Sequence, residues 1–266
     1  TMTARRLKLT VAYDGSAYHG FQRQQNALAV QQVLEERLAP LFGHQLRMTG
    51  AGRTDTGVHA WGQTVHFDTE GRIPAERIPR AARGMLPADI AVVAAEDADP
   101  SFHARRSAVA KRYLYRLRHD APESPFGRHY AWMVTKKLDV AAMEKATEYI
   151  LGKHDFSSFR AVGSAPVQPV RTIFSAGWQA EGNLLTFHVC GDGFLYHMVR
   201  NLVGAFAAVG RGELLVDEFA ALVKAKDRSL APPTAPPQGL FLQKIFYQWA
   251  KNEIYFFQGI DSRDVF

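Results

Sequence analysis

Hydrophobic and polar residues alternate along six stretches of the chain, a pattern typical of β-strands with one buried face. These stretches are residues 5–13, 63–68, 110–117, 171–178, 184–190 and 240–247. A short apolar run at residues 90–95 predicts one more strand. The chain therefore predicts an extensive β-structure in which most strands are half buried.

Apolar residues at helical spacing predict helices over residues 30–41, 140–151, 197–209 and 213–225. Asp139 is a suitable N-cap for the second of these helices, and Gly152 lies just past its end. The helices and strands do not alternate regularly, as they would in a doubly wound parallel sheet. The pattern therefore favours an α+β fold with a mixed, mostly antiparallel sheet.

Two segments near the C-terminus lack a regular pattern. Prolines at residues 231–237 (APPTAPP) predict an extended loop, because proline lacks the backbone donor that helices and central strands need. Residues 248–266 form a tail of mixed character that the pattern leaves unassigned.

Composition adds the class of protein and its expected compartment. The chain has 47% hydrophobic residues and a single cysteine, Cys190, so it has neither an intramolecular disulfide nor a thiolate cluster. The first residues show no apolar signal-peptide core, and no apolar run approaches the roughly 20 residues that span a bilayer. We expect a globular cytoplasmic protein with no membrane partner.

The charge pattern points to nucleic acid. The net charge is +6, and residues 101–118 (SFHARRSAVAKRYLYRLR) carry six Lys or Arg residues and no acid. Tyr113 and Tyr115 are interleaved with these cations, an arrangement that suits a flipped or single-stranded base, since rings stack on bases while cations hold phosphates. The alternative is a strand whose cations merely face solvent.

The best candidate for chemistry is Asp55, in the segment GAGRTDTGVHA at residues 50–60. Its three glycines, Gly50, Gly52 and Gly57, predict unusual backbone angles in a tight, rigid loop that could aim a carboxylate. The simpler interpretation is a turn in which the aspartate caps its own backbone. Arg53 and His59 lie close in sequence to Asp55 and favour the chemical interpretation.

Motifs of several common enzyme classes are missing from the sequence. The ten histidines form no HExxH motif and have no cysteine partner, so no metal site is expected. The chain also lacks the G-x-S-x-G, G-x-G-x-x-G and P-loop motifs. The remaining classes are an enzyme that uses no cofactor and a binding module.

Several further motifs accompany the Asp55 loop, and in order and spacing they resemble the tRNA pseudouridine synthase A family from about residue 7 to residue 242. The motifs are YDGSAYHGFQRQ from Tyr13, VQQVLE from Val30, AGRTDTGVHA from Ala51, GQTVHF from Gly62, LPADIAV from Leu86, FHAR from Phe102, KRYLYR from Lys111, GKHDFSSFR from Gly152, HMVRN from His197, and AKDR through TAPPQGL from Ala225. Phe21 stands where many members have Trp, and the tail lies outside the resemblance.

The resemblance implies a fold and partners that the patterns alone do not show. The fold is the pseudouridine synthase fold, in which two RRM-like (ferredoxin-like) halves with helices on one face join under a central cleft. We expect the halves at residues 1–105 and 106–247, with residues 248–266 as the tail. The implied activity is isomerisation of uridine to pseudouridine in the tRNA anticodon stem-loop, at positions 38, 39 and 40, by a homodimer without a cofactor.

The resemblance also implies roles for individual residues. Asp55 is the catalytic nucleophile, Arg200 its ion-pair partner, Arg53 a residue that displaces or holds the target nucleotide, and Tyr113 a ring that stacks on uracil. Whether Asp55 attacks C1′, attacks C6 or assists elimination to a glycal stays open. The remaining expected substrate-binding residues are Phe21, Gln22, His59 and Arg105, and the expected phosphate contacts are Arg106, Lys111 and Arg112.

Two other classes of function remain open at this point. A non-catalytic RNA-binding module would explain the basic, aromatic segment but gives Asp55 no purpose. A glycosidase would need two carboxylates flanking the bond, and no second acid accompanies Asp55 in the segment GAGRTDTGVHA.

Overall fold

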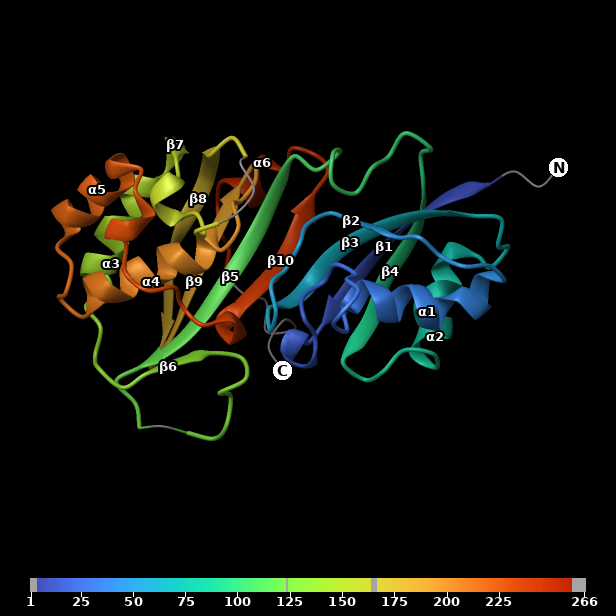
Figure 1. Ribbon diagram of the computed structural model, residues 1–266, viewed down its shortest axis with the longest axis horizontal. Coiled ribbons are helices and arrows are strands. Elements are labelled where there is room, and N and C mark those ends of the chain that lie inside the picture. The colour runs from blue at the N-terminus through green and yellow to red at the C-terminus, as the bar shows by residue number, and fades with distance from the viewer. Residues whose placement is uncertain (1–3, 123, 164–166, 260–266) are drawn as a thin grey trace. The chain divides into compact units, whose positions relative to one another are not determined.

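The computed structural model describes residues 4–122, 124–163 and 167–259. The chain divides into two compact units, Thr1–Val109 with Phe241–Gln248 and Ala110–Leu240 with Trp249–Phe266. Both units combine helices with a mostly antiparallel sheet (Figure 1). The expected α+β class is therefore confirmed.

The sheet of the first unit has the strand order β4-β1-β3-β10, and a short strand β2 also pairs with β3. Its strands are β1 (Arg5–Tyr13), β2 (Thr49–Gly50), β3 (His59–Thr69), β4 (Ile90–Ala98) and β10 (Leu240–Phe246). β1 is antiparallel to β3 and β4, whereas β10 is parallel to β3. Burial alternates along β1, so that Leu7, Leu9 and Val11 are in the core as the sequence pattern predicts.

The two faces of this sheet are covered differently. Helices α1 (Val30–Phe42) and α2 (Ile78–Arg83) lie on one face, where Phe42 packs edge-on against Phe67 of β3 (Figure 1). On the opposite face, the His66 imidazole accepts a hydrogen bond from the Ala104 amide at 3.0 Å. The Tyr247 hydroxyl donates to the Ala104 carbonyl at 2.7 Å. β3 is thus buried on both faces.

The sheet of the second unit has the strand order β5-β9-β8-β7, all antiparallel, and β6 pairs with β5 in parallel. Its strands are β5 (Ala110–His119), β6 (Trp132–Val134), β7 (Gly152–Asp155), β8 (Val170–Glu181) and β9 (Leu184–Gly191). Helices α3 (Val140–Thr147), α4 (Met198–Gly210) and α5 (Val216–Ala225) cover one face. There Phe206 of α4 contacts Trp178, Phe187 and Phe219.

The tail covers the opposite face of the second sheet. Its short helix α6 (Lys251–Ile254) is followed by Phe257, whose ring stacks on His188 at 4.1 Å between centroids. The Ser175 hydroxyl donates to the Ile254 carbonyl at 2.7 Å. Ser175 and His188 alternate with Trp178 and Phe187 along their strands, which places the tail opposite α4. Residues 260–266 lie outside the described part of the chain.

The predicted helices and long strands are present, with ends shifted by a few residues. Asp139 caps α3 by accepting from the Ala142 amide at 3.0 Å, as expected. Gly152 ends no α-helix: α3 gives way to a 3₁₀ turn, and Gly152, with φ of 86°, begins β7. That turn spans Glu148–Ile150, and the other 3₁₀ turns span Gly15–Ala17, Ala75–Arg77, Ser157–Phe159, Arg228–Leu230 and Pro237–Gly239. The elements that the pattern missed are short: β2, β6, β7, α2 and α6.

Among the described residues, no helix combines the length and apolar character needed to cross a membrane.

Several histidines share one structural role, because an unprotonated Nδ1 accepts a backbone N–H. His59 accepts from Gly15, His66 from Ala104, and His119 from Leu138, at 2.9 to 3.0 Å. Burial and the nearby Arg6 and His103 lower the pKa of His66 from its ordinary 6.5 to about 4. Folding therefore requires the neutral form of this imidazole.

We predict that acid destabilises the fold partly through His66. The unfolded chain binds a proton near pH 6.5 and the folded chain only near pH 4, so this contribution is complete above about pH 6.5 and is lost as the pH falls toward about 4. The free energy of unfolding, measured with urea at about pH 7 and about pH 5, should fall less between these pH values in His66→Gln than in wild type. The glutamine amide oxygen accepts the hydrogen bond without titrating.

The matched control is His154→Gln. The His154 Nε2 lies 2.7 Å from the Leu151 carbonyl, to which it must donate. A protonated imidazole also donates, so protonation does not remove this hydrogen bond. Equal pH dependence in wild type and His66→Gln would contradict the role of His66.

Candidate active site

Asp55 lies in the loop between β2 and β3, where its side chain is half buried. The turn after it closes when the Val58 amide donates to the Asp55 carbonyl at 3.1 Å, and Gly57 takes φ of 78°. Gly50 and Gly52 are not in the left-handed region, so the expected unusual backbone angles hold for Gly57 alone. The loop is nevertheless tightly constrained, for a different reason.

That constraint comes from the segment between β1 and α1, which carries the motif YDGSAYHGFQR. The Phe21 amide donates to the Thr54 carbonyl at 3.2 Å, and the Gly57 amide donates to the Tyr18 carbonyl at 3.3 Å. The hydroxyls of Tyr13 and Thr54 share a buried hydrogen bond of 2.7 Å. These bonds hold the backbone on both sides of Asp55.

The two segments approach too closely for side chains at three glycines. A Cβ on Gly20 would lie 2.5 Å from the Thr54 carbonyl oxygen, and Gly20 also has φ of 81°. A Cβ on Gly15 would overlap the Val58 carbonyl, and one on Gly50 would overlap the Phe21 ring. Gly50 therefore serves close packing rather than an unusual backbone angle.

Strand β3 supports the loop from its other side. The Ala51 amide donates to the Thr64 carbonyl at 2.8 Å, and the Gln63 side chain donates to the Gly52 carbonyl at 2.7 Å. Gln63 is fully buried and was not among the expected site residues. The signal in the sequence that could have identified Gln63 was an amide side chain next to a glycine-rich loop, because a buried amide must find a hydrogen-bond partner.

Residues of the expected substrate-binding set divide into exposed and buried groups. Arg53 and Gln22 are exposed, and Arg53 has no hydrogen bond or ion pair within the described ranges. Phe21 is only 2% exposed and stacks with Tyr13. His59 is 1% exposed, accepts from the Gly15 amide and packs on Phe241. Phe21 and His59 thus support the loop from the core.

In the second unit, Tyr113 lies on β5 with its ring 8% exposed and edge-on to Phe194 at 5.0 Å. Because side chains alternate along a strand, Lys111, Tyr113 and Tyr115 share one face. Arg112 faces the other way, is 6% exposed, donates to the Glu253 carbonyl and lies 5.6 Å from the Phe257 ring.

The structure thus buries Arg112, which was expected to contact RNA phosphates, beneath the tail. The tail covers its guanidinium, and burial lowers its pKa. Lys111 is half buried on the Tyr113 face, and Arg105 and Arg106 of the first unit are exposed. The sequence analysis treated the rings and cations of this stretch together. It did not assign them to the two opposite faces of β5.

Arg200 lies in the first turn of α4, half buried, and its Nε donates to the Ala235 carbonyl at 2.8 Å. The Ala235 amide returns a bond to the Arg200 carbonyl at 3.1 Å. The proline-rich segment thus holds Arg200 in place. The proline-rich segment approaches α4 so closely that a Cβ on Gly204 would overlap the Pro233 carbonyl.

Sequence reasoning missed the network that fixes this proline-rich segment. The Arg228 guanidinium donates to the carbonyls of Ala231 and Pro232 at 3.1 Å and to the Asn201 side-chain oxygen at 3.2 Å. The Thr234 hydroxyl donates to the same Asn201 oxygen at 2.6 Å. Arg228 and Asn201 thus fix the segment that holds Arg200.

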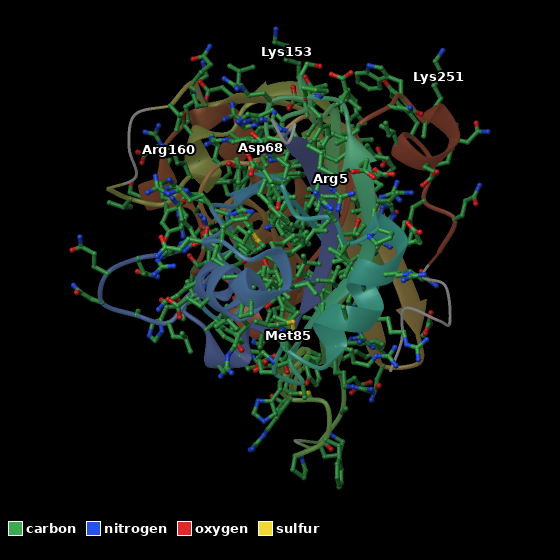
Figure 2. The ribbon with its side chains drawn as sticks, turned by 90° about the vertical axis from the view of Figure 1, so that its right-hand side faces the viewer. Arg5, Asp68, Met85, Lys153, Arg160 and Lys251 are labelled. Atoms are coloured by element: carbon green, nitrogen blue, oxygen red, sulfur yellow. The ribbon has the colours of Figure 1, made fainter. Side chains whose placement is uncertain are left out.

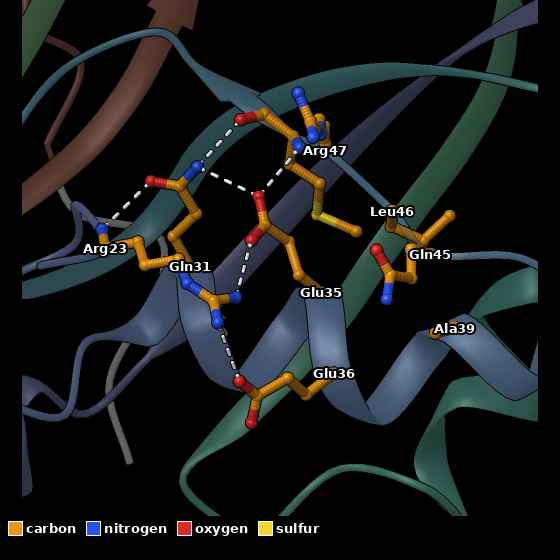
Figure 3. Close-up of a pocket in the computed structure, with 9 residues that line it drawn as sticks. Arg23, Gln31, Glu35, Glu36, Ala39, Gln45, Leu46 and Arg47 are labelled. Carbon is orange, nitrogen blue, oxygen red and sulfur yellow. Dashed lines mark hydrogen bonds and ion pairs between the residues drawn. The ribbon is translucent and has the colours of Figure 1, made fainter. Parts of the chain in front are cut away.

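A surface hollow of the first unit is lined by none of the expected site residues. It has a volume of about 580 Å³ and lies beside α1 (Figure 3). At its wall the Glu35 carboxylate accepts from Arg23 at 3.1 Å, from Gln31 at 3.0 Å and from the Met48 amide at 2.9 Å. These bonds leave the carboxylate fully engaged. Among the described residues, no group of three or more His, Cys, Asp or Glu side chains could hold a metal ion.

The chain is similar to known proteins over most of its length. Residues 9–105 and 146–248 match the family described as tRNA pseudouridine synthase. A tRNA pseudouridine synthase A of Thermoanaerobacter sp. (strain X514) is 43% identical over 91% of this chain and 100% of its own length. The protein of that name from Bacillus subtilis (strain 168) is 43% identical over 91% of this chain and 99% of its own.

A solved structure, a Cbf5-Nop10-Gar1 complex, aligns with a TM-score of 0.35 and 11% identity over 76% of this chain and 44% of that chain. The chain belongs to the tRNA pseudouridine synthase family. It is an isomerase that acts on uridine in tRNA, so the resemblance read from the sequence is confirmed.

We predict that Gly20→Ala damages the Asp55 loop more than the backbone angle alone explains. The matched control is Gly43→Ala, at φ of 77° with nothing within 4 Å of the added Cβ. The control should cost about 1 kcal/mol of stability, from the left-handed backbone. Gly20→Ala should cost about 1–3 kcal/mol more, from the clash with Thr54, and should also lower turnover where both variants are folded.

Denaturant unfolding and a tRNA pseudouridylation assay on both variants test this prediction. Equal stability and equal turnover in the two variants would show that the approach of Gly20 to Thr54 does not hold the loop.

Proposed function

We propose that Asp55 is the nucleophile for isomerisation of uridine to pseudouridine in the anticodon stem-loop of tRNA, at positions 38 to 40. The observation that supports this most is the support given to Asp55, whose neighbouring backbone is bonded to the β1–α1 segment and to β3. A catalytic group must be held in a narrow geometry to act, and a solvent-facing turn does not need such support.

The reaction explains why a single carboxylate suffices. Isomerisation exchanges an N–C glycosidic bond for a C–C bond between the same two rings, so nothing is oxidised and no group is added. It needs a flipped nucleotide, an ionised group facing it, and a base that removes the C5 proton. The chemistry thus requires no cofactor, and Asp55 takes the second of these roles.

The other proposed roles follow from chemistry and family membership. Arg200, held by Ala235, is the ion-pair partner of Asp55. The exposed Arg53 holds or displaces the target nucleotide, and the Tyr113 ring stacks on uracil. The exposed side chains of Gln22, Arg105 and Arg106, with the half-buried Lys111, contact the RNA around it.

We also propose that the enzyme works in the cytoplasm as a homodimer. Family membership supports the dimer, and the single, buried Cys190 suits a reducing compartment. The order of the chemical steps, attack at C1′, attack at C6 or elimination to a glycal, is left open by the residues alone.

Asp55→Asn tests the nucleophile. The amide has nearly the shape of the carboxylate but no charge, so we expect tritium release from C5-labelled uridine in tRNA to fall by about 10³-fold or more. The Kd for tRNA should stay close to that of wild type. Turnover near the wild-type rate would exclude Asp55 as nucleophile, and wild type that binds tRNA without releasing tritium would favour a non-catalytic RNA-binding module.

Tyr113→Phe separates stacking from proton transfer, because it keeps the ring and removes the hydroxyl. If the hydroxyl moves a proton, kcat should fall by about 10²-fold or more with little change in tRNA binding. The matched control is Tyr115→Phe, two residues along the same face of β5, whose hydroxyl bonds the Pro236 carbonyl at 2.7 Å. The control should lose about 1 kcal/mol of stability and retain its kcat. An unchanged kcat in Tyr113→Phe would leave that ring a stacking role only.

A further inference from the structure

A line of arginines lies along α2 of the first unit, outside every group considered above. We call Arg77, Arg80 and Arg83 the α2 arginines. Arg77 is the residue before the helix, Arg80 lies within it and Arg83 is its last residue. Residues three apart on a helix are neighbours, about 5–6 Å between Cβ atoms, so the three side chains follow one another along the surface. In Figure 2, α2 faces the viewer, with Arg5 and Met85 labelled near it.

All three side chains are exposed, and none has an ion pair or hydrogen bond with any other described residue. Residues 71–88 contain four arginines and one acid, Glu76. By contrast, Arg5 beside this segment is fully used: it binds Asp97 and donates to the Gly71 and Ile73 carbonyls. Those bonds anchor the chain that leads into α2.

Helix stability explains only part of the pattern. Arg80 and Arg83 lie in the last turn, where positive charge suits the negative end of the helix dipole. Arg77 lies at the opposite end, where the dipole disfavours a cation. The hydrophobic side of α2, Ile78 and Ala82, is buried and does not need arginines to cover it. A polyanion that runs along the helix accounts for all three positions.

The helix is tied to the Asp55 loop within the same unit. Six residues after Arg83, the Asp89 carboxylate accepts from the Tyr18 hydroxyl at 2.7 Å, and the Asp89 carbonyl accepts from the Asp14 amide at 2.9 Å. The Tyr18 carbonyl in turn accepts from the Gly57 amide, two residues from Asp55. The α2 arginines therefore have a fixed position relative to the Asp55 loop.

We infer that the α2 arginines bind the sugar-phosphate backbone of the substrate tRNA outside the target nucleotide. This inference rests on the proposed function and extends the bound RNA beyond the loop that carries the reacting uridine. Arginine is suited to the role because its planar guanidinium presents several donors to phosphate oxygens. Contacts of this kind set affinity and orientation and read no sequence.

The test measures tRNA affinity as a function of salt. Each phosphate contact contributes about 0.7–0.9 to the slope of log K against log salt concentration. The triple variant Arg77→Gln, Arg80→Gln, Arg83→Gln should lower that slope by about 2 and weaken binding most at low salt. Its KM should rise while kcat at saturating tRNA stays unchanged, since none of the three residues is part of the catalytic machinery.

Two controls isolate the effect of position and charge. The variant Arg77→Lys, Arg80→Lys, Arg83→Lys keeps the charge and should keep most of the slope. The variant Lys145→Gln, Lys224→Gln, Lys251→Gln removes the same charge from exposed positions of the second unit and should leave the slope almost unchanged. If it lowers the slope as much as the arginine triple variant does, the α2 arginines hold no particular site and the inference is wrong.

The single variant Arg77→Gln, which lies outside the helix, serves if the triple variant does not fold, and it should lower the slope by about 0.7–0.9. The inference fails if wild type releases tritium from tRNA but the salt slope is the same in wild type and in the Gln variants. Failure of the proposed function looks different, because wild type would then release no tritium at all.

Discussion

The close approach of two backbone segments in the first unit is the constraint on which the candidate site depends. Gly15 and Gly20 bring the chain after β1 against the carbonyls of Val58 and Thr54, at distances that leave no room for a Cβ. This contact fixes the backbone on both sides of Asp55 without using the carboxylate itself. Backbone amides and carbonyls thus hold the loop in one geometry.

The sequence predicts much of this arrangement, but not the contacts that hold it together. The glycines, Asp55 and the YDGSAYHGF motif are all visible, and alternation along residues 5–13 predicts β1. Pattern alone does not show that Gly50 leaves room for the Phe21 ring, or that Gln63 binds the Gly52 carbonyl. Both facts depend on residues far apart in sequence, so only the folded chain shows them.

Strand β5 shows a limit of another kind. Its sequence places cations beside aromatic rings, yet Tyr113 and Arg112 are on opposite faces because strand side chains alternate. The burial of Arg112 could not be foreseen, since the residues that cover it, Glu253 and Phe257, belong to a tail whose pattern predicts no regular element. Composition along a strand is thus informative about binding only after its residues are divided between the two faces.

The histidine beside the Asp55 loop illustrates the same distinction between sequence proximity and function. His59 is four residues from Asp55 and invites a role in proton transfer. Its Nδ1 instead accepts from the Gly15 amide, and its ring packs on Phe241 in the core. An imidazole nitrogen used in this way is engaged with the backbone, whereas a catalytic acid or base must reach the substrate to exchange a proton. His59 therefore holds Gly15 against the loop that carries Asp55.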